Sequence, residues 1–211
     1  MIKNILFDFD GVIIDSMPVR EYGFRKIFQN FDTNLVDKLI DYHELNGGLS
    51  RFIKIKYFYE KLLNKNIDEE LILEYANSFS KIMKNELINK KYLINQTVEF
   101  IINHTQNYNL HIVSGSEQNE LRYLCKELDL SQYFDSIHGS PTHKNILVKE
   151  LLKKLNYNIQ ETILIGDSIN DYEAATVNNI NFYGYNNTEL LKLSADYLVD
   201  FKPLIKNIVQ Y

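Results

Sequence analysis

The chain opens with a short apolar run that ends in acidic residues and a glycine. Residues 1–11, MIKNILFDFDG, predict a buried strand whose carboxyl end carries polar side chains. From about residue 18 to residue 87 the apolar positions follow the helical period, with Asp32 and Asp68 as expected N-caps and Gly47-Gly48 as a break between helices. No strand is expected within that block.

Strand and helix patterns alternate after the helical block. The predicted strands are 110–114, 136–138, 162–165, 181–185 and 197–199, and the predicted helices are 97–105, one ending at 128, 145–155 and 172–177. This alternation predicts an α/β fold with a doubly wound parallel sheet. The all-helical block is therefore expected to form a small cap (residues 17–88) inserted into a core made of residues 1–16 and 89–211.

Composition limits the classes of function. The 211 residues are 45% hydrophobic and 24% charged, which allows one well-packed core with a smaller insert. The net charge of −5 lacks the basic excess of nucleic-acid binders, and no apolar run fits a membrane helix or a signal peptide. We therefore expect no nucleic-acid or membrane partner and a cytoplasmic location. The single Cys125 is expected to be a buried, inert thiol, and the five histidines show no metal-ligand spacing.

Two acidic clusters follow apolar strands. Asp8 and Asp10 end the first strand, and Gly11 predicts a turn that lets both side chains face one site. Asp167 and Asp171 follow the strand at 162–165. Either cluster alone also fits a helix cap or a solvated turn. Together they predict a metal site, because carboxylates about 4 Å apart repel by roughly 4 kcal/mol per pair and oxygen ligands favour Mg²⁺.

Groups suited to phosphate lie between these clusters. Ser114 and Gly115 end a predicted strand and offer a hydroxyl and backbone amides at the same edge of the sheet. Lys144 precedes a predicted helix, where it can direct a positive charge into the crevice. Taken alone, Ser114 also fits a helix cap and Lys144 a solvated surface charge.

In this order the four segments resemble the haloacid dehalogenase superfamily over nearly the whole chain. The motifs are Asp-x-Asp-Gly-Val, Ser after a strand, Lys, and Gly-Asp-x-x-x-Asp, arranged around a helical insert that resembles the cap of β-phosphoglucomutase-like and phosphoglycolate phosphatase-like members. The resemblance implies a Rossmann-like core, a magnesium-dependent phosphatase activity and a small phosphorylated metabolite as substrate.

The resemblance also implies roles for individual residues. Asp8 would be the nucleophile that forms an aspartyl-phosphate, and Asp10 the general acid and then base. Ser114 and Gly115 would bind the phosphoryl oxygens, and Lys144 would neutralise charge around the transferring group. This agrees with the needs of phosphoryl transfer, which are in-line positioning and charge neutralisation.

The metal ligands follow from the same resemblance. Mg²⁺ would be held by Asp8, the backbone carbonyl of Asp10 and Asp167. Asp171 matches the last acid of the motif, whose contact with the metal is often indirect.

The cap loop Gly48-Leu49-Ser50-Arg51 resembles the specificity loop of β-phosphoglucomutase-like members. Arg51 is therefore predicted to contact the end of the substrate that does not react. The alternative is a solvated arginine at a helix start that Ser50 caps. Mutases of that group carry a histidine where this chain has Arg20, a departure that favours hydrolysis over transfer to a second hydroxyl.

Other functions remain as alternatives. A sugar-phosphate mutase uses the same aspartyl-phosphate chemistry with a different acceptor. A receiver-like signalling protein shares acids, a hydroxyl and a lysine around a phosphorylated aspartate, but the helical insert and the chain length argue against it. A non-catalytic protein that binds a phosphorylated ligand is the third alternative, although every residue needed for turnover is present.

Overall fold

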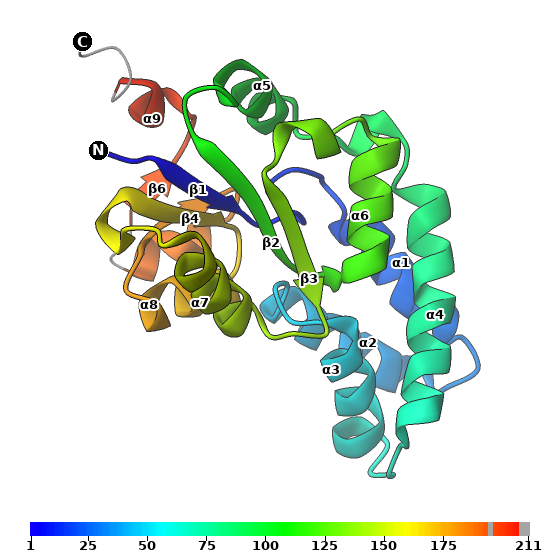
Figure 1. Cartoon of the computed structure of the whole chain (residues 1–211). Coiled ribbons are helices and arrows are strands. Elements are labelled where there is room, and N and C mark those ends of the chain that lie inside the picture. Colours follow the sequence, from blue (N-terminus) through cyan, green and yellow to red (C-terminus); the bar gives the residue numbers. More distant parts are fainter. Residues whose placement is uncertain (194–195, 207–211) are drawn as a thin grey trace.

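A computed structural model describes residues 1–193 and 196–206 of the chain. The centre of the molecule is a six-stranded sheet with the order β3-β2-β1-β4-β5-β6, in which each neighbouring pair is parallel (Figure 1). The strands are β1 (Asn4–Phe7), β2 (Asn109–Glu117), β3 (Ser136–Ser140), β4 (Thr162–Gly166), β5 (Asn181–Tyr185) and β6 (Asp196–Leu198). The predicted doubly wound α/β fold is therefore confirmed.

Helices cover both faces of the sheet. On one face, α5 (Asn95–His104), α6 (Gln118–Glu127) and α9 (Lys202–Lys206) pack in the same hydrophobic cluster as Ile5 and Phe7. On the other face, α7 (Lys144–Leu155) and α8 (Ile169–Val177) pack in the cluster that contains Leu6. Alternate residues of a strand point to opposite faces, so a strand buried on both sides is a nearly continuous apolar run, as residues 5–7 of β1 are. Short 3₁₀ helices complete the core: η2 (Lys90–Tyr92), η3 (Ser131–Tyr133), η4 (Ile159–Glu161) and η5 (Thr188–Leu193).

The cap lies between β1 and β2 in the sequence. It consists of α1 (Met17–Ile27), α2 (Thr33–Leu45), α3 (Arg51–Tyr57), the π-helical turn η1 (Phe58–Leu62) and α4 (Glu69–Glu86). Asp32 and Asp68 are N-caps as predicted, because their carboxylates accept from the amides of Asn34 and Leu71, each at 2.8 Å. Gly47 and Gly48 lie in the turn between α2 and α3, where the break was predicted.

Aromatic rings fill the interior of the cap. Phe28 stacks on Phe58 with ring centres 4.1 Å apart, and Phe24 packs on Phe79 at 4.5 Å. These side chains belong to the same hydrophobic cluster as the Ile5 face of the sheet. The cap and the core therefore share one continuous apolar interior.

The two chain segments that join cap and core lie side by side and form a strap, which comprises residues 13–15 and 92–94. The amide of Ile94 donates to the carbonyl of Ile13 at 2.9 Å, and the amide of Asp15 donates to the carbonyl of Tyr92 at 2.7 Å. An antiparallel bridge pairs Ile14 with Leu93. The cap is thus attached through one hydrogen-bonded crossing.

Most differences from the predicted elements lie at their boundaries. β2 runs on to Glu117 instead of ending at Ser114, and the ladder with β3 is irregular between Val113 and Glu117. The short helix α9 was not predicted. Cys125 is buried as expected, and burial raises the pKa of its thiol to about 12, so the thiolate is disfavoured. No helix within the described ranges is both long and apolar enough to span a membrane.

Phe28→Ala should destabilise the protein by about 3–5 kcal/mol, because it removes a fully buried ring that the surrounding aromatics cannot replace. Urea unfolding followed by circular dichroism measures the change. Tyr22→Ala is the matched control on α1, since Tyr22 is 51% exposed and its loss should cost less than about 1 kcal/mol. Equal losses in the two variants would contradict the assignment of Phe28 to the cap interior.

Candidate active site

The order of the strands creates a crevice at one edge of the sheet. From β1 the chain continues to β2 and β3 on one side and later to β4, β5 and β6 on the other. Ligands of such sheets bind where the order reverses, outside the carboxyl ends of the strands. Figure 1 shows the arrows of β2 and β3 pointing toward the cap helices α2 and α3. The predicted residues of the core lie at this edge: Asp8 and Asp10 after β1, Ser114 and Gly115 in β2, Lys144 after β3, and Asp167 and Asp171 after β4.

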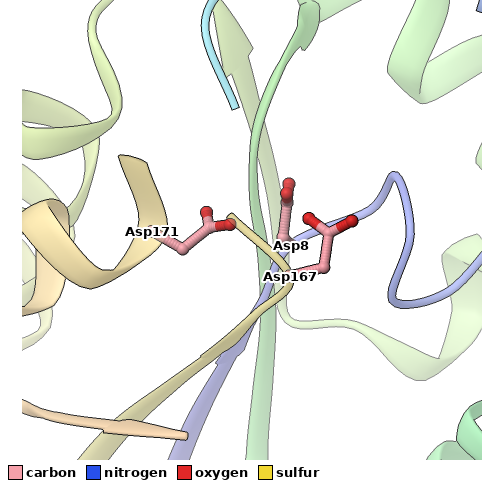
Figure 2. Close-up of side chains that lie close together, drawn as sticks. All are labelled: Asp8, Asp167 and Asp171. Atoms are coloured by element: carbon pink, nitrogen blue, oxygen red, sulfur yellow. The ribbon is translucent and has the colours of Figure 1, made fainter. Parts of the chain in front are cut away.

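Three carboxylates converge in the crevice. One oxygen each of Asp8, Asp167 and Asp171 lies within 4.8 Å of the others. Figure 2 shows Asp8 and Asp167 side by side, with Asp171 reaching toward them from α8. Asp8 is 2% exposed and Asp171 is fully buried. The predicted convergence of two acidic strand ends is therefore found in the structure.

Lys144 is the cation of this cluster. It begins α7, is 4% exposed, and places its Nζ 3.0 Å from Asp8 Oδ1 and in direct contact with Asp171 Oδ1. Burial alone would lower the pKa of Lys144, but Asp171 and Asp8 raise it above its usual range. Lys144 is therefore a fixed positive charge and not a solvated surface lysine.

One lysine does not compensate three carboxylates. Burial, together with the nearby Asp171, raises the pKa of Asp8 to about 7, although Lys144 acts in the opposite direction. Burial and the neighbouring Asp8 also raise the pKa of Asp167 well above its usual range. The hard oxygen donors and their uncompensated repulsion fit a divalent cation such as Mg²⁺. Asp8 and Asp167 are the side chains best placed to hold it.

Asp171 also has a structural role. Its Oδ2 accepts from the Ser168 amide at 3.1 Å and from the Ser168 hydroxyl at 2.6 Å, at the start of α8. Ser168 is the N-cap residue of α8, so the helix-cap interpretation of this acidic cluster holds for Ser168 and Asp171. It does not hold for Asp167, whose carboxylate lies close to that of Asp8. Through its other oxygen, Asp171 orients Lys144.

Asp10 occupies a different environment. Its carboxylate accepts from Arg20 Nε at 2.5 Å, from the Ser116 hydroxyl at 2.6 Å and from the Ser16 hydroxyl. Burial alone would raise the pKa of Asp10, but Arg20 and the two hydroxyls hold it below its usual range. The side chain thus points toward the cap, which leaves its backbone carbonyl as the candidate metal ligand. Sequence reasoning did not identify Ser16 or Ser116 as partners of Asp10.

Gly11 allows the close approach of the two acidic strand ends. Its φ is +72°, in the left-handed region, and a Cβ there would lie 1.8 Å from Asp167 Oδ2. The turn predicted at Gly11 is therefore confirmed. Asn186 Nδ2 donates to the carbonyl of Gly11 at 3.0 Å, and Asn187 Nδ2 donates to the carbonyl of Asp167 at 2.7 Å. The two asparagines directly follow β5, and sequence reasoning did not identify them.

The predicted phosphate-binding residues lie beneath the cap. Ser114 is 1% exposed, and its hydroxyl accepts from the Ser116 amide at 3.0 Å. A Cβ at Gly115 would lie only 2.2 Å from the carbonyl oxygen of Gly48, which belongs to the loop between α2 and α3. The cap loop is thus in direct contact with this part of β2, and the site is closed.

Arg51 connects the cap to the core. It is 4% exposed and forms two hydrogen bonds to Glu120 of α6, at 2.5 and 2.6 Å. It also donates to Ser80 Oγ at 2.6 Å, and its guanidinium stacks over the Phe79 ring at 4.6 Å. Arg51 is therefore not solvated, and Ser50 makes no side-chain cap.

Glu120 had no distinguishing signal in the sequence. It is fully buried, and Arg20 Nη1 lies 3.5 Å from Oε1 of the same carboxylate that pairs with Arg51. Two cap arginines thus meet one core carboxylate, and Arg20 extends the network to Asp10.

The chain is similar to known proteins in sequence. The haloacid dehalogenase-like hydrolase family matches residues 5–185. A phosphoglycolate phosphatase of Colwellia psychrerythraea is 23% identical over 192 residues, which cover 86% of this chain and 85% of that protein. A phosphorylated carbohydrates phosphatase of Thermotoga maritima is 22% identical over 180 residues, which cover 82% and 80%.

Solved structures show the same fold. The β-phosphoglucomutase of Clostridium difficile is similar with a TM-score of 0.76 at 22% identity, over 100% of this chain and 96% of that chain. The family match runs from β1 through β5 and includes the cap, the three carboxylates and Lys144. This chain therefore belongs to the haloacid dehalogenase-like hydrolase family.

Proposed function

We propose that this enzyme is a magnesium-dependent phosphatase that hydrolyses a small phosphomonoester through an aspartyl-phosphate on Asp8. The observation that carries the proposal is the convergence of Asp8, Asp167 and Asp171 around Lys144 in a closed crevice. The phosphatases among its relatives support the choice of a phosphorylated metabolite as substrate.

In the first step, a carboxylate oxygen of Asp8 attacks the phosphorus of the substrate and the ester P–O bond breaks. The leaving oxygen takes a proton from Asp10. Lys144 offsets negative charge beside Asp8, while Ser114 and the amides near Gly115 bind phosphoryl oxygens. Fixed charges and donors aimed at the developing charge provide most of the rate enhancement in such reactions.

In the second step, water attacks the phosphorus of the aspartyl-phosphate and gives its proton to Asp10. This restores the Asp8 carboxylate and releases inorganic phosphate. The ionised Asp10 held by Arg20 is the form that accepts this proton. Donation in the first step needs the protonated acid, so the contacts around Asp10 must change between the two steps.

Asp8, Asp167 and the backbone carbonyl of Asp10 are the proposed ligands of Mg²⁺, and Asp171 supports the site through Lys144. The bound ion would neutralise the carboxylates and polarise the phosphoryl oxygens.

A sugar-phosphate mutase is the alternative within the family. It would transfer the phosphoryl group to a second substrate hydroxyl instead of water. Arg20 contacts Asp10 in this structure. The mutases that this chain resembles carry a histidine at the position of Arg20, and this difference supports hydrolysis. Release of inorganic phosphate in step with substrate consumption, without an isomeric sugar phosphate, distinguishes the phosphatase from the mutase.

Asp8→Asn should reduce turnover of p-nitrophenyl phosphate by at least about 10³-fold, because a neutral amide is a poor nucleophile and a weaker metal ligand. The measurement is steady-state release of p-nitrophenol with Mg²⁺. Asp41→Asn, at an exposed position in the cap, is the matched control and should keep full activity. Substantial activity in Asp8→Asn would refute the mechanism.

Removal of divalent metal should abolish activity, and added Mg²⁺ should restore it. Asp167→Ala should raise the Mg²⁺ concentration needed for half-maximal activity, because one side-chain ligand is lost. Asp10→Asn should still bind Mg²⁺, since the backbone carbonyl remains. Titration of activity and of metal binding in EDTA-treated enzyme tests all three statements, and full activity in excess EDTA would overturn them.

Arg51 remains the predicted contact for the remote end of the substrate. Arg51→Ala should lower kcat/KM for the best substrate of a metabolite screen by the equivalent of about 1.5–3 kcal/mol relative to p-nitrophenyl phosphate, because a charged hydrogen bond is lost. Because the same change leaves the buried Glu120 with only Arg20, both substrates should also lose some activity. Equal losses on both would assign Arg51 to cap closure alone.

A further inference from the structure

We propose that the closed site selects phosphate monoesters of short hydroxy acids, and that Lys54 binds the substrate carboxylate at the end remote from the phosphoryl group. This inference rests on the proposed function, because it concerns the same site. It names the chemical class of the substrate and a residue that determines specificity.

The subsite is a cavity between the cap and the core. It measures about 20 Å³ and is lined by Lys54, His43 and Arg51 from the cap and by Asp10, Gly115 and Ser116 from the core. Since Asp10 is the proposed proton donor to the leaving oxygen, this cavity is where the leaving-group end of the substrate lies.

The buried charges around this cavity do not balance. Arg51 pairs with Glu120, and Arg20 pairs with Asp10. Lys54 is the third buried cation, and no carboxylate oxygen of the described residues lies within 4.0 Å of its Nζ. Beside this cavity Lys54 is thus a buried amine without a carboxylate partner, and its charged form is costly unless a ligand supplies an anion.

The contacts of Lys54 are neutral. Its side chain is 2% exposed in the fold, and its Nζ donates to the carbonyl of Gly47 at 3.1 Å and lies 2.8 Å from His43 Nδ1. Burial, assisted by Arg20, lowers the pKa of Lys54 to about 7, although Asp10 acts in the opposite direction. An anion in the cavity would hold Lys54 in its charged form.

The unsatisfied groups at the cavity are donors. Within the described part of the chain, His43 Nε2 and Arg51 Nε are buried without a hydrogen-bond partner. A charged Lys54 has no lone pair, so beside it His43 accepts at Nδ1 and carries its own proton on Nε2. Burial lowers the pKa of His43 to about 2, so this donor is neutral. Both residues line the cavity, so a ligand with several acceptor oxygens would find donors on them and on Lys54.

The free space in the closed site favours a small anion. A single water needs about 10–15 Å³ of such space, so a cavity of about 20 Å³ takes a group only slightly larger than water. A planar carboxylate on a short chain meets this limit better than a sugar ring or a second phosphoryl group. The contact between Gly48 and Gly115 is backbone against backbone, so side-chain movements cannot widen the cavity there.

The first experiment compares kcat/KM for phosphoglycolate and for 2-hydroxyethyl phosphate, which replaces the carboxylate by a neutral hydroxymethyl group. The wild type should prefer phosphoglycolate by about 10- to 100-fold, the range expected for a hydrogen bond to a charged group. Lys54→Met should abolish this preference. Lys56→Met is the matched control, because Lys56 lies on the same helix with its side chain 57% exposed and should keep both the preference and the activity.

The second experiment measures binding without turnover. Calorimetric titration with Mg²⁺ present compares 3-phosphonopropionate and 3-hydroxypropylphosphonate, the non-hydrolysable counterparts of the two esters. The ratio of their dissociation constants should be about 10- to 100-fold in the wild type and near one in Lys54→Met. If circular dichroism shows that Lys54→Met is not folded, Lys54→Gln takes its place.

The two experiments separate this inference from the proposed function. A binding preference without hydrolysis of any ester would refute the phosphatase and leave the carboxylate subsite standing. Hydrolysis of p-nitrophenyl phosphate without the preference, or a preference that survives at Lys54→Met, would overturn the subsite. Tighter binding of 1,3-propanediylbisphosphonate than of 3-phosphonopropionate would also overturn it, because the cavity would then accept a second phosphoryl group.

Discussion

The contact between Lys144 and two buried carboxylates is the interaction on which the site depends. Asp8 and Asp171 come from different strand ends, and each would repel the other in a dry crevice without a cation between them. α7 begins at Lys144, so the helix that covers one face of the sheet also places the ammonium. Burial and mutual repulsion nevertheless leave Asp8 and Asp167 with raised pKa values, and a divalent ion bound there would relieve the repulsion.

The charged side chains of the cap form a second network of ion pairs. Asp10 links this network to the cluster around Lys144. Arg20 contacts Asp10, Ser116 and Glu120, and so joins a helix of the cap to two segments of the core. Arg51 pairs with Glu120 from another cap helix. Closure of the cap therefore assembles ion pairs as well as apolar contacts, and Asp10 has its contact with Arg20 only while the cap is closed.

The sequence predicted those features that follow from local rules. Parallel strands end at one edge of a sheet, so Asp8 and Asp167 had to approach each other, and Gly11 indicated the turn that permits it. Glu120 illustrates what local rules do not reveal. It lies in a helix with the composition of a surface helix, and its partner Arg51 is 69 positions away in the chain. Only the packing of the cap on α6 identifies it as a buried counterion.

The burial of Lys54 could not be predicted from local rules for a similar reason. A lysine one turn after Arg51 fits an exposed helix face, and only the fold shows that Lys54 is buried and that Arg51 already has a partner. The Asn186-Asn187 pair supports the site through backbone carbonyls, a contact with no characteristic spacing in the sequence.

The paired strap has a consequence for the rate of turnover. Residues 13–15 and 92–94 are hydrogen-bonded to each other, so the two crossings would bend together if the cap moved relative to the core. The same strap begins three residues after the Asp10 carbonyl. Opening of the closed crevice for product release would involve such a movement, and gating motions of this kind set the turnover rate of many enzymes. The stiffness of the strap would then affect the turnover rate, although the strap lies apart from the phosphoryl group.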